Sequence, residues 1–158
     1  MSDQSFEAQS QTVQKVAALF DPVIQNLANL ALVGKQMHWH VRGATFISVH
    51  ELLDEIVEHA LEHTDNAAER VVALGLPVNM TKEAIAENAS TSSVEPKFIQ
   101  AAAAINIVIG AIDAVREPLK VAVEELGDLD PVSQDVAIGI LGALEKDRWF
   151  LHAHISID

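Results

Sequence analysis

Apolar side chains recur every three or four positions along most of the chain, a spacing typical of amphipathic α-helices. The first such segment runs from about Val13 to Val41 and contains Pro22. Either a helix begins at this point, with Asp21 as its N-cap and the proline as its first residue, or a longer helix is kinked at the proline. The sequence leaves both alternatives open.

A second long helix is predicted after the break at Arg42-Gly43. It ends at about Leu74, because a glycine and a proline follow within three residues. Its start is ambiguous. Ser48 has capping-box spacing to Glu51, but the helix can also begin nearer Thr45.

Three further helices complete the pattern. The polar stretch 78–94 contains the sequence TKEAIAEN, which can form a short helix. A third long helix is expected from about Glu95 to Leu126, with a bend at Pro118. The last helix should begin after Asp130, which is followed by proline in the arrangement of an N-cap and a first helical residue, and should run to the C-terminus.

These segments predict an all-α protein, an antiparallel four-helix bundle with a short extra helix in the central loop. No linker or repeat divides the chain, so residues 1–158 are interpreted as one domain. Residues 1–12 are polar and acidic, and we expect a flexible tail there rather than a signal peptide. The longest apolar stretch, Ala101 to Ile112, is too short to cross a bilayer. We therefore expect a cytoplasmic protein with no membrane partner.

The amino-acid composition excludes several classes of function and chemistry. The 23 acidic and 10 basic residues give a formal net charge of −13, and the first 14 residues contain no Lys or Arg. Such a chain repels phosphate backbones, so we expect no nucleic-acid partner. The lack of Cys excludes disulfides and thiolate chemistry. Hydrophobic residues make up 49% of the chain, and this high content indicates further burial between subunits.

Four side chains suited to metal binding share one face of the second long helix. Counting from His50 at about 100° per residue, Asp54, Asp65 and Glu69 all fall within roughly a quarter-turn. His38 lies near the end of the preceding helix. Imidazole and carboxylate groups together suit iron, manganese or zinc. However, His50 and Asp65 are about 22 Å apart along the helix axis, so one ion cannot touch both within one chain.

Antiparallel pairing of this helix with its copy in a second subunit would bring the separated ligands together. His38 and His50 of one chain then meet Asp65 and Glu69 of the other, at two equivalent sites of a two-fold dimer. Asp54 either binds the metal directly or holds an imidazole or a water molecule beside it. The Glu-x-x-His pairs that hold two irons inside one subunit are absent, because no Glu stands three residues before any histidine.

The segment from Lys35 to Pro77 resembles the signature of the Dps proteins, which are ferritin-like mini-ferritins. The matching residues are His38-Trp39, Val41-Arg42-Gly43, Phe46, His50-Glu51-Leu52, Asp54, Asp65 and Ala68-Glu69-Arg70. The C-terminal segment, DPVSQD to LEKDRWFLHAHI, is similar to the last helix of that family.

The resemblance implies a hollow homo-dodecamer built from two-fold dimers, with a ferroxidase centre for two iron ions at each two-fold interface. His38 and His50 would come from one subunit, and Asp54, Asp65 and Glu69 from the other. Ferrous iron would be oxidised there, preferentially by hydrogen peroxide, and stored inside as ferric oxide, which protects against oxidative stress during starvation. Zinc or manganese could substitute for iron.

The resemblance also assigns roles outside the metal ligands. Trp39 would intercept a one-electron oxidising equivalent beside the iron, although plain core packing is the alternative for this side chain. Acidic residues at the start of the last helix line pores that admit Fe²⁺ in the family, and Asp130 and Asp135 stand at matching positions.

Two rival functions stay open. The same donors could lower the pKa of a metal-bound water and hydrolyse small amides or esters, as a main or a side activity. A DNA-compacting protein is a third class, which the negative charge disfavours.

Five other histidines have no assigned role. His59 and His63 lie opposite the ligand face of the second long helix, where their i, i+4 spacing permits a weak metal site, but we expect a solvated face. His40 is expected to face solvent. His152 and His154 lie too far apart around a helix to chelate one ion together.

Overall fold

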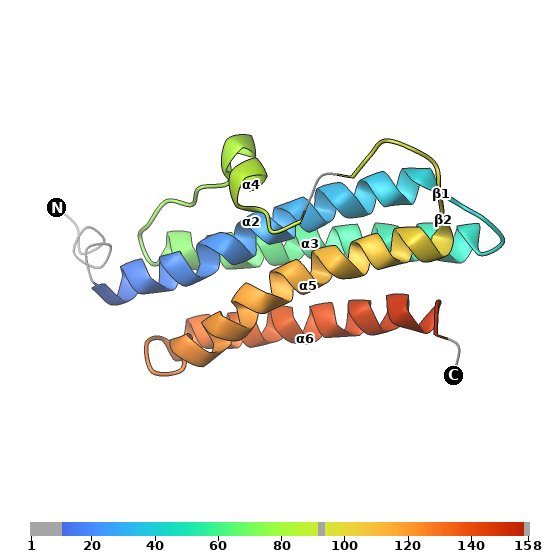
Figure 1. Ribbon diagram of the computed structural model, residues 1–158. Helices are drawn as coiled ribbons and strands as arrows, with labels where there is room; N and C mark the ends of the chain where they lie inside the picture. The colour runs from blue at the N-terminus through green and yellow to red at the C-terminus, as the bar shows by residue number, and fades with distance from the viewer. Residues whose placement is uncertain (1–10, 92–93, 157–158) are drawn as a thin grey trace.

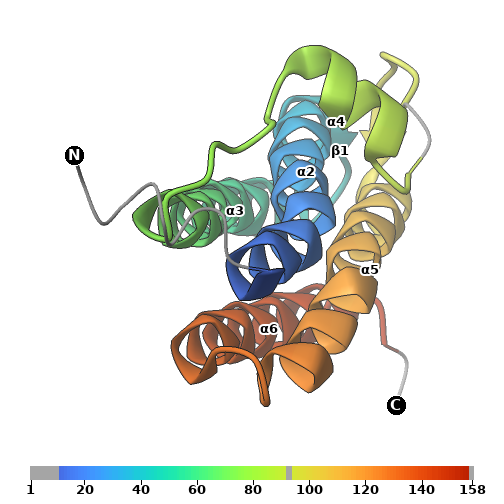
Figure 2. The same cartoon turned by 90° about the vertical axis from the view of Figure 1, so that its left-hand side faces the viewer.

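Four long helices lie lengthwise against one another in the computed structural model, which describes residues 11–91 and 94–156 (Figure 1). They are α2 (Gln11–His40), α3 (Phe46–Ala73), α5 (Ala101–Leu126) and α6 (Pro131–Ala153). The short helix α4 (Lys82–Asn88) lies against the outside of α2, within the long connection from α3 to α5 (Figure 2). The predicted all-α four-helix bundle with an extra helix in its central loop is confirmed.

The strands β1 (Val41–Arg42) and β2 (Ile99–Gln100) form a small parallel pair in the described part of the chain. Val41 pairs with Ile99, and Arg42 pairs with Gln100. This pairing joins the end of α2 to the start of α5, so the long crossover returns to the end of the bundle where α3 begins. One long crossover of this kind is a ferritin-like connection.

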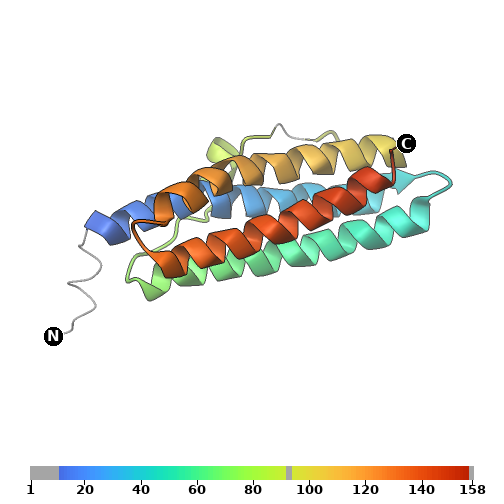
Figure 3. The same cartoon turned by 90° about the horizontal axis from the view of Figure 1, so that it is seen from below.

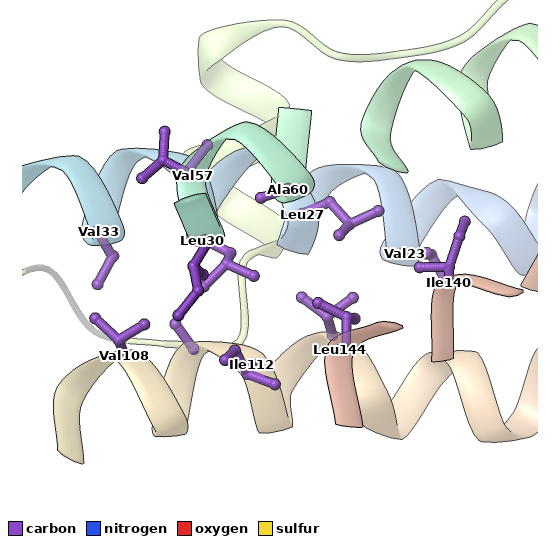
Figure 4. Close-up of a cluster of buried hydrophobic side chains, with 14 of the residues drawn as sticks. Val23, Leu27, Leu30, Val33, Val57, Ala60, Val108, Ile112, Ile140 and Leu144 are labelled. Carbon is purple, nitrogen blue, oxygen red and sulfur yellow. The ribbon is translucent and has the colours of Figure 1, made fainter. Parts of the chain in front are cut away.

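The core runs along the axis of the bundle, and all four long helices contribute to it. Figure 4 shows Leu27 and Leu30 of α2, Ile112 of α5 and Leu144 of α6, side chains that the bundle buries completely. Burying a side chain of this size contributes about 1.5–3 kcal/mol relative to exposing it. Packing of these apolar faces therefore holds the helices together and fixes the positions of the candidate ligands.

Helix α2 continues through Pro22 without interruption, so the longer of the two alternatives is correct. Proline removes one backbone donor from the helix, and the side-chain amide of Asn26 donates a hydrogen bond of 2.8 Å to the carbonyl oxygen of Pro22. Gln11 and Thr12, the last two residues of the expected tail, are helical. Residues 1–10 of that tail lie outside the described residues.

By length and composition, α2 is the one described helix that could cross a membrane. Most of its apolar segment is buried inside the bundle. A core helix of a water-soluble bundle has the same composition, because its apolar side chains face other helices.

Of the two open starts for α3, the one nearer Thr45 is correct, and the predicted start of α5 is wrong. Helix α3 begins at Phe46 with Thr45 in the N-cap position, and the Ser48 hydroxyl donates to the Thr45 carbonyl oxygen instead of forming a capping box. Helix α5 begins at Ala101 rather than near Glu95, because the residues before it pair with β1.

The other helix ends follow the sequence signals. Thr81 accepts a hydrogen bond from the main-chain nitrogen of Ala84 and caps α4. Asp130 accepts one from the main-chain nitrogen of Val132 and caps α6. Gly75 adopts a φ of 95° just after α3, a backbone conformation that favours glycine.

Candidate metal centre

His38 and His50 bind each other across the connection between α2 and α3. Nδ1 of His38 lies 2.8 Å from the carbonyl oxygen of His50, and Nδ1 of His50 lies 2.8 Å from the carbonyl oxygen of His38. The two rings are stacked, with centroids 3.7 Å apart and 19° between their planes. The structure thus brings together the two histidines that the sequence predicted as ligands of one site.

These two hydrogen bonds fix which ring nitrogens carry protons. A carbonyl oxygen can only accept, so Nδ1–H must be the donor in both rings. A neutral imidazole has a single N–H, which leaves the lone pair of each Nε2 available. Metal-binding histidines are commonly held in this way, by a hydrogen bond from the nitrogen that does not bind the metal.

The short turn between α2 and α3 brings the two histidines close enough for this contact. Gly43 adopts a φ of 126°, which allows the chain to reverse within a few residues. Phe46, the first residue of α3, packs against His50 with ring centroids 5.0 Å apart. His38 is only 8% exposed, so its ring is held by the surrounding structure.

Asp54 completes the group that one chain supplies. It lies one helical turn after His50, and its Oδ1 atom is 3.9 Å from Nδ1 of His38 in the same chain. Its assignment to the opposite subunit from the histidines is therefore wrong. Lys35 donates a hydrogen bond to the Asp54 carboxylate. This bond lowers the pKa of Asp54 below its ordinary value of 3.8, with smaller help from the nearby His38.

Lys35 belongs to this group although it was not among the predicted site residues. The signal was present, because Lys35 stands three residues before His38 on the same helix and therefore on the same face. Its ammonium group offsets the charge of Asp54 when no cation is bound, which keeps the half-exposed carboxylate paired.

Asp65 and Glu69 lie far from the histidine pair in the same chain. Both are exposed, and α3 is one uninterrupted helix over these positions. At 1.5 Å per residue, they stand about 22 Å and 29 Å from His50 along the axis. Within residues 11–91 and 94–156, no three His, Asp or Glu side chains are arranged so that they could hold a metal ion. One chain therefore carries two separated halves of the predicted ligand set.

Large apolar side chains are exposed on the same face of α3 as these ligands. Ile47, Leu61 and Val72 are 60%, 56% and 57% exposed. Counted around the helix from His50, they fall at about 60°, 20° and 40°, within the arc of the candidate ligands. Exposed apolar side chains gathered on one face mark an interaction surface.

Trp39 is 61% exposed beside His38, so core packing within the chain does not explain it.

The two pore candidates differ in their surroundings. Asp130 accepts hydrogen bonds from Arg70 at 2.5 Å and from the Ser133 hydroxyl at 2.6 Å. Burial by itself raises the pKa of Asp130, but these hydrogen bonds outweigh it, and the pKa lies below 3.8. Asp135 is exposed on the first turns of α6. The Asp130 carboxylate is thus hydrogen-bonded to groups of its own chain, while Asp135 is exposed to solvent.

Two expectations about the other histidines are wrong. His40 is half-buried, and its ring meets Phe98 edge-on with centroids 6.1 Å apart. His63 is also half-buried rather than on a solvated face, and its neighbour His59 contacts the buried Asp147.

Comparison with known proteins identifies the family. A model of the ferritin-like domain matches residues 17–157. The DNA protection during starvation protein of Mycolicibacterium smegmatis is 38% identical over 144 residues, which cover 89% of this chain and 77% of that protein. Dps from Microbacterium arborescens in its high iron form superposes with a TM-score of 0.89 at 42% identity, over 94% of this chain and 97% of that one.

DpsA14 from Streptomyces coelicolor also superposes, with a TM-score of 0.87 at 31% identity, over 93% of this chain and 88% of that one. The fold, the histidine pair and these relatives agree, and the chain belongs to the Dps family of ferritin-like proteins.

Proposed function

We propose that this protein is a ferroxidase that oxidises Fe²⁺ with hydrogen peroxide at sites shared between two subunits. Membership of the Dps family supports ferritin-like iron storage and protection against oxidative damage. The finer assignment rests on one observation. His38 and His50 present two free Nε2 lone pairs, while the matching carboxylates stand about 22 Å or more away on the same helix face.

Antiparallel pairing of two α3 helices joins the two halves. When His50 lies opposite Glu69 of the partner subunit, Asp54 lies opposite Asp65 of the partner subunit. The same register sets the exposed Ile47 opposite Val72 of the partner subunit, which is exposed as well. One arrangement thus completes the ligand set and covers apolar surface, as an isologous interface requires.

The chemistry follows from the donor types. Two neutral imidazoles and several ionised carboxylates bind two Fe²⁺ ions as substrate. Each Fe²⁺ gives up one electron, and one hydrogen peroxide takes both electrons and two protons to form two water molecules. Peroxide is then reduced in a single two-electron event, so no hydroxyl radical is released. Trp39, the exposed residue that follows His38 in the sequence, would supply an electron when only one iron is present.

The remaining parts of the proposal concern assembly and location. Six such dimers form a hollow dodecamer in the cytoplasm, which stores the Fe³⁺, and Zn²⁺ or Mn²⁺ can occupy the same centres. Asp135, with Asp130 behind it, lines the entry pores for Fe²⁺. Twelve chains of net charge −13 form a strongly anionic particle, which attracts cations and repels nucleic acid.

The experiment is the double substitution His50→Ala with Asp65→Ala, one from each half of the centre. We expect the variant to lose rapid peroxide-dependent iron oxidation, followed by absorbance, and to keep the wild-type mass on size-exclusion chromatography. Glu55→Ala is the matched control, because Glu55 is exposed on α3 outside the ligand arc. Wild-type rates in the double variant would contradict the proposal.

A further inference from the structure

The opposite side of α3 carries a second group of metal-binding side chains. His59 and His63, one helical turn apart, face α6, which runs alongside α3 in the view from below (Figure 3). Asp147 of α6 is 3% exposed, and its two carboxylate oxygens lie 3.0 and 3.1 Å from Nδ1 of His59. Around the helix axis, both histidines lie about 180° to 220° from His50, so this group is separate from the interface centre.

Asp147 determines how the His59 ring is presented. A carboxylate accepts hydrogen bonds, so Nδ1–H of His59 is the donor, and the lone pair of Nε2 is free in the neutral ring. The His59 side chain is 47% exposed, so a cation in solution can approach this ring. A carboxylate behind a histidine is the usual support of a metal-binding imidazole. Burial raises the pKa of Asp147, and the hydrogen bond from His59 opposes that rise.

His63 lacks the partners that a buried imidazole needs. Both of its ring nitrogens are shielded from solvent, and neither has a hydrogen-bond partner in the part of the chain that the structure describes. Its ring centroid lies 6.5 Å from that of His59. Buried polar atoms without partners are rare and commonly indicate a bound water or ion.

We propose that His59 and His63 bind one divalent transition-metal ion, of the kind that imidazole prefers, such as Zn²⁺ or Co²⁺. Histidines at i and i+4 on a helix can reach the same ion. Asp147 is a positioning residue that holds His59, and water molecules complete the coordination. Three converging protein ligands are absent from the described residues, so the site is weaker than a structural zinc site.

This site does not depend on the proposed ferroxidase function, because a single chain supplies both ligands. The exposed Glu62, next to His63, adds negative charge that attracts a cation. The site also differs from the interface centre in its donors, which are imidazoles rather than a mixture with several carboxylates. It therefore selects metals that favour nitrogen ligands.

The test is titration of the assembled full-length protein with Co²⁺, followed by its visible absorption. We expect the His59→Ala and His63→Ala variants to bind one Co²⁺ fewer per chain than the wild type. Asp147→Asn should keep the stoichiometry but weaken this binding about 10- to 100-fold. His154→Ala is the control, because His154 is exposed at the end of α6, and it should bind as the wild type does.

The His50→Ala, Asp65→Ala protein separates this site from the interface centre. One Co²⁺ per chain should remain bound there, and adding His63→Gln should remove it. His63→Gln also preserves a polar side chain, and circular dichroism checks that each variant is folded. Unchanged Co²⁺ binding in the His59 and His63 variants would overturn the proposal and leave the histidines as structural partners of Asp147.

Discussion

The side chains of His38 and His50 each donate a hydrogen bond to the main-chain carbonyl oxygen of the other residue, with both distances at 2.8 Å. This exchange ties the last turn of α2 to the first turns of α3. It also leaves the lone pair of each Nε2 atom free to bind a metal ion. The same contacts thus stabilise the fold locally and prepare the ligands for metal binding.

The substitution His50→Phe separates these two contributions. Phenylalanine keeps an aromatic ring against His38 but cannot donate to its carbonyl oxygen or bind metal. We expect a loss of about 1 kcal/mol in the free energy of unfolding, the typical net value of one hydrogen bond. Peroxide-dependent iron oxidation should fall to the background rate. Denaturant unfolding and stopped-flow absorbance check the two parts, and a variant that oxidises iron at the wild-type rate would show that His50 is not a ligand.

Asp130 makes the stability of the protein depend on pH. Its pKa in the folded protein lies below the ordinary 3.8, because the hydrogen bonds from Ser133 and Arg70 outweigh the effect of burial. The carboxylate therefore stabilises the fold above about pH 4, and this contribution is lost as the pH falls through the folded-state pKa.

Asp130→Asn tests this contribution while retaining a good N-cap for α6. We expect the variant to lose about 2 kcal/mol in the free energy of unfolding at pH 7, because the partly buried hydrogen bond from the Arg70 guanidinium is weakened. The difference from the wild type should shrink as the pH falls through the folded-state pKa of Asp130, because the wild-type carboxyl group then becomes neutral as well. Thermal melts of the variant and the wild type, at pH 7 and at a pH below the folded-state pKa, measure this difference in stability. An equal difference at the two pH values would exclude the charge as its cause.

Leu61 lies near the centre of the exposed apolar face of α3. In the proposed antiparallel register it faces Glu58 of the partner subunit. Leu61→Glu should therefore break the two-fold pair, because it removes apolar contact and opposes two carboxylates. Light scattering should show a smaller particle, while Leu61→Met should assemble normally. A Leu61→Glu protein with the wild-type mass and activity would rule out this register.

The surface charge predicts no binding to DNA. The chain carries a formal net charge of −13, so its assembly repels the phosphate backbone at neutral pH. We expect no retardation of duplex DNA in a gel at physiological salt. Retardation that disappears as salt is added would show a basic surface that the total charge conceals.

The sequence predicted the bundle because its signals are local. Apolar spacing set the helices, and the Asp130-Pro131 pair set the start of α6. Local sequence signals gave wrong or ambiguous helix ends where contacts between distant segments determine the structure. Core packing carries α2 through Pro22, and pairing with β1 delays the start of α5 until Ala101.

The same distinction between local and long-range determinants applies to the candidate site. The arc of ligands on α3 follows from helical periodicity, and so does the separation of His50 from Asp65. The contact of Asp54 with Lys35 and His38 depends on how α2 packs against α3, which periodicity does not determine. The contact of His59 with Asp147 depends in the same way on how α6 packs against α3.

Complementation between two inactive chains tests the shared centre most directly. One chain carries His38→Ala and His50→Ala, and the other carries Asp65→Ala and Glu69→Ala. Each alone should lack rapid peroxide-dependent iron oxidation. When the two are co-expressed in equal amounts, half of the dimers are mixed, and each mixed dimer regains one of its two centres. We predict about one quarter of the wild-type rate. A mixture no more active than its separate components would contradict the shared centre.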